Sequence, residues 1–375
     1  MGIPHPSAKG GPPIHLPYLV EYFKNRPGYK IKTFYYGSIQ GDRESAIKKI
    51  FYTILKIIEF LYDIFFYRPD IVHLNTAFGS KSLLRDVPFS LLSFIFRKNL
   101  LFKIHGSHLN LLMTKNKYRL VLIKLFFLGA KKIGVLSERE KQEFITQFGH
   151  KNKMIVVKNI VKDMTREKEE RIYLKKKKTT VFGLFVSRIE RDKGLDDLIS
   201  ALPEIINKIP NFKLLIVGDG IEKENCVNLA KQNLANNFID WLGYLNRGEL
   251  NKIYEIADLF IFPTHLPEGM PMVLLEAMKY RIPILTTKVR FAESYFKEFE
   301  NCIYIEKGNI KDIAKKIIVL FLDKQLQLTI IENNFRFIKN FSPEKVGLEF
   351  EDIYWEMLNY KKAKIKTSIE KNRLF

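Results

Sequence analysis

Short apolar runs alternate with helix-patterned stretches along the whole chain, and the series restarts near its middle. Runs of this kind, bounded by turn residues and joined by helices, are typical of a parallel sheet covered by helices. The two series are separated by residues 162–179, "KDMTREKEERIYLKKKKT", which are mostly charged and show no periodicity. We interpret this stretch as a linker. The sequence therefore predicts an α/β protein with two Rossmann-like, doubly wound domains that face each other across a cleft.

The expected elements follow from this alternation in both halves. In the first half we expect strands at Lys30–Tyr36, Ile71–Asn75, Leu101–His105, Lys132–Leu136 and Met154–Val157, and helices at Leu16–Asn25, Ala46–Tyr67 and Glu138–Gln147. In the second half we expect strands at Val181–Val186, Phe212–Val217, Phe238–Trp241, Leu259–Phe262 and Ile282–Thr286, and helices near 194–208, 222–235, 248–256, 271–280 and 309–322. Functional residues are expected where the strands end.

Length and composition narrow the class of protein. A chain of 375 residues is long for a single core, and its 46% hydrophobic residues suffice for two packed domains. Cys226 and Cys302 lack the spacing of metal ligands, which favours a reducing cytosol over a disulfide framework or a zinc site. The first residues, "MGIPHPSAKGGPP", lack the apolar core of a secretory signal, and charges interrupt the most apolar helices. We expect a soluble, cytoplasmic protein.

The net charge of +21 is concentrated in the first half of the chain. Residues 1–160 hold 26 Lys and Arg against 10 Asp and Glu, whereas residues 161–375 hold 36 against 31. A basic half favours an anionic partner, which could be acidic lipid headgroups, a polyphosphate ligand or nucleic acid. The alternative is a genome-wide bias towards lysine, which explains the total charge better than its asymmetry.

The stretch "PEGMPMVLLEAM" at residues 267–278 places two carboxylates, Glu268 and Glu276, around a turn and an apolar helix. Pro271 suits the first position of a helix, so the N–H groups of Met272 and Val273 would point out of its positive end. Such a helix start is suited to an anion. Glu276 lies inside the apolar helix and needs a partner, either a pair of sugar hydroxyls or, alternatively, a Lys or Arg in a buried ion pair.

Basic residues follow the first strand of the second half. In "FVSRIERDKG" at residues 185–194, Arg188 and Lys193 leave the strand end five residues apart. Two cations beside a helix start suit a diphosphate, because arginine binds oxygens bidentately and lysine adds a point charge. The stretch "LLIVGDG" at residues 214–220 fits any nucleotide-binding α/β protein, and its glycines could serve the turn alone.

Together these motifs resemble a known family. "VSRIERDKGLDDLI", "KLLIVGDG", "FIDWLGYL" and "ADLFIFPTHLPEGMPMVLLEAMKYRIPILTT" stand in the order and spacing of retaining family 4 glycosyltransferases of the GT-B fold, within their "glycosyl transferases group 1" domain. The resemblance implies a donor domain at residues 180–341 that binds a UDP- or GDP-linked sugar. In that family the two glutamates form an E-x7-E motif. By this resemblance, the catalytic residues would be Glu268, in contact with the donor sugar, and His105. The residues that would bind the donor are Arg188 and Lys193 at the diphosphate, Glu276 at the ribose, and Gly269, Met270, Met272 and Val273 through their backbone.

The resemblance also assigns residues in the first domain, 1–161. Gly11, in the glycine-rich loop "AKGGPP", would approach a phosphate, and His105 would reach the donor sugar near the reacting carbon. Asn75 would line the acceptor side. We expect the opening strand of the family to be truncated, since only three residues precede "PHPSAKGG": either the true start lies upstream or the strand is degenerate. Residues 342–375 would pack back onto this domain.

The predicted function is transfer of a sugar with retention to a glycan or polyprenyl-linked acceptor, in bacterial or archaeal surface polysaccharide synthesis such as lipopolysaccharide, capsule or exopolysaccharide. No D-x-D motif is present, so no metal and no cofactor are expected. The basic first domain predicts peripheral contact with the anionic inner face of the membrane. The alternatives are an epimerase or sugar-phosphate synthase of the same fold, a catalytically dead scaffold, and a nucleic-acid-binding protein. The chain lacks a recognised nucleic-acid reader module, so no nucleic-acid partner is expected.

Overall fold

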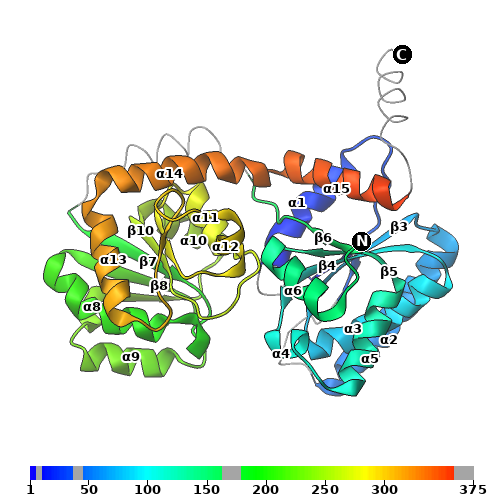
Figure 1. The fold of residues 1–375 in the computed structure, drawn as a ribbon, viewed down its shortest axis with the longest axis horizontal. Helices are drawn as coiled ribbons and strands as arrows, with labels where there is room; N and C mark the ends of the chain where they lie inside the picture. Colours follow the sequence, from blue (N-terminus) through cyan, green and yellow to red (C-terminus); the bar gives the residue numbers. More distant parts are fainter. Residues whose placement is uncertain (6–10, 37–44, 163–178, 359–375) are drawn as a thin grey trace, which may run out of the picture. The chain divides into compact units, whose positions relative to one another are not determined.

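The computed structural model describes residues 1–5, 11–36, 45–162 and 179–358, and the chain divides into two compact units (Figure 1). The first unit comprises Met1–Lys162 together with Phe341–Phe375, and the second comprises Asp163–Asn340. Except for Lys162 and Thr179, the stretch interpreted as a linker lies outside the described residues, as do Gly10 and residues 359–375. Within the described residues, no helix is long and apolar enough to cross a bilayer.

The first unit is built on a parallel sheet of six strands. Their order across the sheet is β2-β1-β3-β4-β5-β6, so the direction of winding reverses between β1 and β3. The long central strands β3 and β4 carry the core, with Leu74, Phe102 and Ile104 fully buried. The strands are β1 (Gly2–Ile3), β2 (Phe34–Tyr35), β3 (Ile71–Phe78), β4 (Asn99–Ser107), β5 (Ala130–Val135) and β6 (Met154–Val156).

The opening strand is present as the two residues of β1. Gly2 and Ile3 pair in parallel with Phe34 and Tyr35 of β2, and Gly2 also pairs with Leu74 of β3. Because β1 offers β2 only two residues to pair with, the strand expected over Lys30–Tyr36 is confined to Phe34–Tyr35. A short strand therefore occupies the position beside the reversal point of the sheet.

Six helices connect these strands: α1 (Pro12–Lys24), α2 (Ala46–Tyr62), α3 (Ser80–Ile95), α4 (Leu109–Leu112), α5 (Lys117–Gly129) and α6 (Glu138–Phe148). Helix α2 continues as one π-helical turn, η2 (Asp63–Tyr67). The last described helix, α15 (Pro343–Met357), packs on α1 within this unit. Glu351 of α15 accepts a hydrogen bond from the Tyr22 hydroxyl at 2.8 Å and pairs with Arg26 at 2.6 Å.

The second unit repeats the design with the strand order β12-β11-β10-β7-β8-β9. Its strands are β7 (Val181–Val186), β8 (Phe212–Val217), β9 (Ile239–Gly243), β10 (Leu259–Phe262), β11 (Ile284–Thr286) and β12 (Ile303–Tyr304). The helices are α8 (Leu195–Lys208), α9 (Lys223–Gln232), α10 (Arg247–Ile256), α11 (Met272–Lys279), α12 (Arg290–Tyr295), α13 (Ile310–Leu322) and α14 (Lys324–Ile338). The chain winds from β7 outwards to β9 and then crosses to β10 on the other side of β7. The predicted α/β class with two doubly wound sheets is confirmed.

Candidate nucleotide-sugar site

The motifs of the second half meet where the winding of its sheet reverses. β7 and β10 are neighbours in this sheet, paired through Gly183 with Leu259 and Leu184 with Phe260. In doubly wound sheets, ligands bind outside the carboxyl ends of the strands at this switch point. Two loops leave these ends, residues 187–194 after β7 and residues 263–271 after β10. The basic motif and the first glutamate therefore share one edge of the sheet.

Lys193 and Glu268 are brought into direct contact there. The Lys193 ammonium donates to Glu268 Oε1 at 2.5 Å, although the two residues are 75 positions apart in the chain. The lysine side chain is only 8% exposed, whereas that of the glutamate is 26% exposed. An ammonium group has three donors and this contact uses one, so a further anion can still accept hydrogen bonds from Lys193.

Backbone geometry places Lys193 against the β10 loop. Gly194 follows it with φ at +69°, and a Cβ atom at this position would lie 2.2 Å from the carbonyl oxygen of Pro263. The His265 N–H donates to the carbonyl of Asp192 at 2.9 Å, and the Thr264 hydroxyl reaches the same oxygen at 3.3 Å. Only glycine meets both the conformation and the close approach. Residues 192–194, at the end of the basic motif, therefore pack directly against the loop that carries Glu268.

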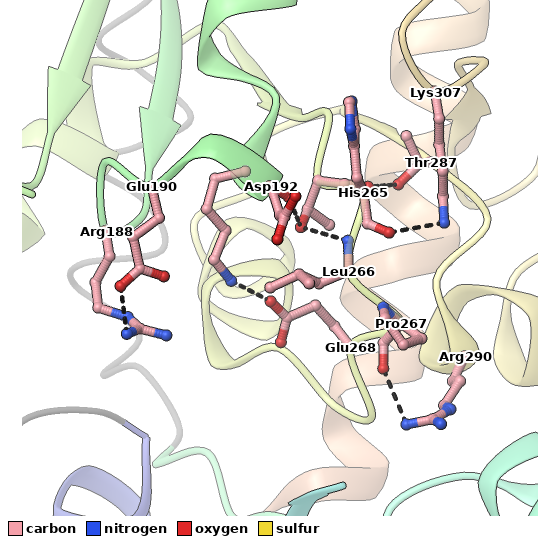
Figure 2. A network of polar contacts seen from close by, with 12 residues as sticks. Arg188, Glu190, Asp192, His265, Leu266, Pro267, Glu268, Thr287, Arg290 and Lys307 are labelled. Atoms are coloured by element: carbon pink, nitrogen blue, oxygen red, sulfur yellow. Dashed lines mark hydrogen bonds and ion pairs between the residues drawn. The ribbon is translucent and has the colours of Figure 1, made fainter. Parts of the chain in front are cut away.

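The loop before Glu268 is fixed from several further elements (Figure 2). The His265 ring contacts Asp197 of α8 at 2.7 Å. Lys307 donates to the carbonyl of His265 at 3.0 Å, and buried Arg290 donates to the carbonyl of Pro267 at 3.2 Å. These contacts connect the loop to α8 and to two later segments of the second unit.

Sequence reasoning assigned no role to these supporting residues. His265 stands inside the quoted motif and could have been identified from its place beside Glu268. Lys307, Arg290 and Thr287, whose hydroxyl donates to the carbonyl of Thr264 at 2.6 Å, come from later segments. They carry no local signal, because only the folded sheet brings them to this edge.

Arg188 is not part of the Lys193–Glu268 contact. Its side chain is 70% exposed and pairs with Glu190 at 2.6 Å, in the same loop. Exposed pairs of this kind contribute little, so an anion with more than one oxygen can compete for the guanidinium. The structure thus brings together two of the predicted donor residues and leaves Arg188 paired nearby in sequence.

The glycines of "LLIVGDG" serve close backbone packing. A Cβ atom on Gly218 would lie 1.8 Å from the carbonyl oxygen of Ser187, and one on Gly220 would lie 2.1 Å from that of Ile189. The Ile189 N–H in turn donates to the carbonyl of Asp219 at 3.0 Å. The turn therefore supports the loop that carries Arg188, which is the plainer of the two roles considered for these glycines.

Helix α11 begins one residue later than the sequence indicates. Pro271 is the N-cap, with extended backbone and no side-chain cap, and the first helical residue is Met272. The prediction of Pro271 at the first helical position was wrong by one residue, because Leu274 N–H already donates to the Pro271 carbonyl. Gly269 and Met270 form the buried turn between Glu268 and this helix. The N–H groups of Met272 and Val273 still belong to the uncapped first turn, where helices attract anions.

Glu276 lies in the second turn of α11 and is buried, at 8% exposure. Burial raises the pKa of its carboxyl, and this outweighs the opposing effects of the Arg247 guanidinium and the Tyr254 hydroxyl. Arg247, the first residue of α10, approaches the carboxylate to 3.9 Å and is itself 45% exposed. The ion-pair alternative for Glu276 is therefore present only as a long contact, which leaves the carboxylate room for hydroxyl donors.

In the first unit, His105 and Asn75 are brought together. His105 Nε2 lies 2.9 Å from Asn75 Oδ1, and the Asn75 amide donates to the carbonyl of Gly2 at 2.9 Å. Burial, together with Lys103 and His73, holds the pKa of His105 well below its usual range, so the ring is neutral. Within the described chain its Nδ1 is buried without a hydrogen-bond partner. Gly11 is the N-cap of α1.

Comparison with known proteins finds similarity to a known family over the second half of the chain. Residues 165–337 match the family model described as glycosyl transferases group 1. The chain is 32% identical over 181 residues to the capsular polysaccharide biosynthesis glycosyltransferase CapM of Staphylococcus aureus, covering 48% of this chain and 47% of CapM. It is 24% identical over 183 residues to the alpha-monoglucosyldiacylglycerol synthase of Acholeplasma laidlawii, covering 49% of this chain and 45% of that protein. The chain spans about half the length of these curated relatives.

A solved structure resembles nearly the whole chain. The Anabaena protein Alr3699/HepE, in complex with UDP and glucose, superposes with a TM-score of 0.71 at 18% identity, covering 94% of this chain and 98% of that one. The GT-B fold expected from the motifs is confirmed, and so is the resemblance to the glycosyl transferases group 1 family.

Proposed function

We propose, from the group 1 domain over residues 165–337 and the GT-B fold around it, that this chain is a glycosyltransferase that uses a nucleoside-diphosphate sugar. The observation that carries the proposal is the contact between buried Lys193 and Glu268 at the switch point of the second sheet. A cation that is fixed there, beside the uncapped start of α11, suits the diphosphate of such a donor.

Charge stabilisation is the chemical task of this site. When the sugar leaves, negative charge builds on the diphosphate, and fixed positive groups lower the barrier for that step. We assign this role to the Lys193 ammonium, the N–H groups of Met272 and Val273, and the Arg188 guanidinium after it leaves Glu190. Glu268 orients Lys193 and contacts the sugar. Because one of its oxygens already accepts a hydrogen bond from Lys193, we assign it a positioning role and not that of a nucleophile.

Glu276 is proposed to hold the ribose. An ionised carboxylate accepts two hydroxyl hydrogen bonds, and the Arg247 guanidinium approaches it only to 3.9 Å. In the first unit, Nε2 of the neutral His105 ring donates to Asn75 Oδ1, so its buried Nδ1 can accept a hydrogen bond from a hydroxyl of the donor sugar. Asn75 fixes the ring through Nε2 and would act by positioning.

The stereochemical course is proposed to be retention. The acceptor would enter on the face that the diphosphate leaves, and the departing phosphate would help to take the proton of the acceptor hydroxyl. No second carboxylate need act as a base. Nuclear magnetic resonance of the first-formed product would show the same anomeric configuration as the donor, and an inverted product would contradict this course.

The donor is proposed to carry UDP or GDP, and the acceptor to be a glycan or polyprenyl-linked glycan of a bacterial or archaeal surface polysaccharide. Relatives named for capsular polysaccharide and glycolipid synthesis, and a structural neighbour solved with UDP and glucose, support this choice.

The experiment that tests the proposal follows release of nucleoside diphosphate from UDP- and GDP-sugars with and without polyprenyl-linked oligosaccharide. We expect release only when the acceptor is present. Conversion of the nucleotide sugar into its epimer, without net release of nucleoside diphosphate, would favour an epimerase. Release that requires a sugar phosphate would favour a sugar-phosphate synthase. Absence of release with all donors, together with absence of nucleotide binding, would contradict the proposal.

Turnover is further proposed to be independent of a divalent metal, since Lys193 and the start of α11 supply the positive charge at the diphosphate. Rates in excess EDTA should match those in buffer. Complete loss of activity on chelation, restored by magnesium or manganese, would show that the charge is supplied by an ion.

A further inference from the structure

Helix α2 presents an apolar stripe to solvent. Within the described residues its exposed apolar side chains recur every three or four positions, which places them on one face of the helix. Each of them is between 44% and 79% exposed. We name this set the α2 stripe: Ile47, Ile50, Phe51, Ile54, Leu55 and Ile58.

The apolar surface continues beyond α2 on the same unit. In η2, Phe65 and Phe66 are 53% and 73% exposed, and Phe65 packs edge-on against Phe96 at the end of α3. Next to Phe96, Phe94 and Ile95 are also exposed. α3 contacts both α2 and α5, and Figure 1 shows these three helices gathered beside the first sheet. An exposed apolar surface that spans adjacent helices marks an interaction site more often than scattered apolar residues do.

The charge around this surface is strongly positive. Segments 45–70, 80–98 and 109–129 hold 12 Lys and Arg against 4 Asp and Glu. Of the four acids, Asp63 and Asp86 are buried, and Glu59 pairs with Lys56 at 2.7 Å. The exposed cations at the helix surface include Lys48, Lys117, Arg119 and Lys124. The surface therefore combines apolar side chains with a basic surround and very little exposed negative charge.

We propose that the α2 stripe and its basic surround bind the surface of an anionic lipid bilayer. Apolar side chains can enter the boundary between headgroups and acyl chains while lysines and arginines contact lipid phosphates. Charge selects this partner over a second copy of the chain, because an isologous dimer through this surface would bring two basic surrounds together. The surface would hold the enzyme where a lipid-linked acceptor lies.

Flotation with vesicles tests the proposal on the full chain. We expect the protein to float with phosphatidylcholine vesicles that contain phosphatidylglycerol, in low salt, and to float less in moderate salt because exposed charges are screened. Pure phosphatidylcholine should recruit much less. A protein that stays at the bottom with anionic vesicles in low salt would overturn the proposal.

Matched variants assign the binding to the stripe. Ile50→Ser, Ile54→Ser and Ile58→Ser combined should lower the bound fraction about tenfold or more, since at least half of each side chain is exposed to solvent. The control combines Ile221→Ser, Leu322→Ser and Leu328→Ser, which are exposed apolar residues of the second unit, and should float like the parent. Equal flotation of both triple variants would overturn the assignment.

Two further measurements distinguish membrane binding from the proposed sugar transfer and from self-association of the chain. The stripe variant should bind nucleoside diphosphate as the parent does, so loss of flotation with intact nucleotide binding isolates the membrane surface. Sedimentation velocity without lipid should show a monomer. A concentration-dependent dimer that the stripe variant abolishes would overturn the choice of a bilayer and assign the surface to a second copy.

Discussion

Lys193 forms the ion pair with Glu268 that connects the loop after β7 to the loop after β10. Its buried ammonium already contacts one carboxylate, so a diphosphate would enter a site where the cation is oriented and partly desolvated. Lys193→Ala should weaken nucleoside-diphosphate binding about tenfold or more, since hydrogen bonds to charged groups contribute roughly 1.5–3 kcal/mol. Isothermal titration with UDP and GDP measures the change. The matched control is Lys213→Ala, which removes a half-exposed pair with Asp240 elsewhere in the same sheet and should bind normally.

We expect the ionised Glu276 carboxylate to lower the stability of the fold and to strengthen nucleotide binding. Its carboxyl has a raised folded pKa, so ionisation above that pKa costs folding free energy, and the cost disappears below the unfolded value of about 4.5. The Glu276→Gln variant should therefore have a melting temperature at pH 7 that is no lower than that of the parent. Any increase in melting temperature should become smaller as the pH approaches about 4.5. The same variant should bind nucleotide about tenfold more weakly. Exposed Glu204→Gln is the control. A variant that melts lower but binds normally would contradict the assignment.

Among single residues, the sequence identifies as candidate site residues those that stand out from their neighbours along the chain. Glu276 stands out because a carboxylate interrupts an apolar helix, and Lys193 because a glycine follows it after a strand. Whether Arg188 would join Lys193 or pair with nearby Glu190 could not be predicted, since both depend on side-chain rotation in an exposed loop. Arg290 acts on a carbonyl 23 residues away, for which no sequence pattern exists.

Between elements, Gly194 determines how the basic loop meets the β10 loop. Gly194→Ala adds a Cβ atom against the Pro263 carbonyl and strains a φ of +69°, so α8 and the Lys193 turn must move. We expect a loss of stability of about 1–3 kcal/mol together with weaker nucleotide binding. Gly248→Ala, in the first turn of α10 where the nearest atom lies 3.4 Å from the added Cβ, should be neutral or slightly stabilising. Thermal melts and nucleotide titrations of both variants check this pair.

Elements buried on both faces could be predicted well, and marginal ones less well. β7, β8 and β10 have the expected bounds because a continuous apolar run fills each of them. β2 is shorter than expected because its length depends on β1, and pairing with a distant two-residue strand leaves no trace in the sequence of β2. α2 was expected to run to Tyr67, but its last turn is π-helical, and it ends where Arg68 adopts a positive φ.

For the whole molecule, pH should act on the first unit through Lys103. Burial lowers the pKa of this lysine to about 7, beneath α15, where its ammonium donates to the carbonyl of Lys158 at 2.7 Å. Between pH 7 and the unfolded value of 10.5 the unfolded chain binds more protons, so stability due to this residue rises with pH. This gain in folding free energy is lost as the pH falls towards 7. Thermal melts should show a pH dependence from 7.5 to 9.5 that Lys103→Met reduces, by up to about 1.4 kcal/mol per pH unit. Identical slopes in parent and variant would contradict the buried titration.

The central claim is that the switch point of the second sheet binds the diphosphate of a nucleotide sugar. A crystal structure of the full chain with UDP or GDP tests it most directly. The account predicts phosphate oxygens on the Lys193 ammonium and the N–H groups of Met272 and Val273, Arg188 turned away from Glu190, and ribose hydroxyls on Glu276. Nucleotide bound elsewhere on the chain, with the Lys193–Glu268 contact free of phosphate and no ribose hydroxyl on Glu276, would contradict it.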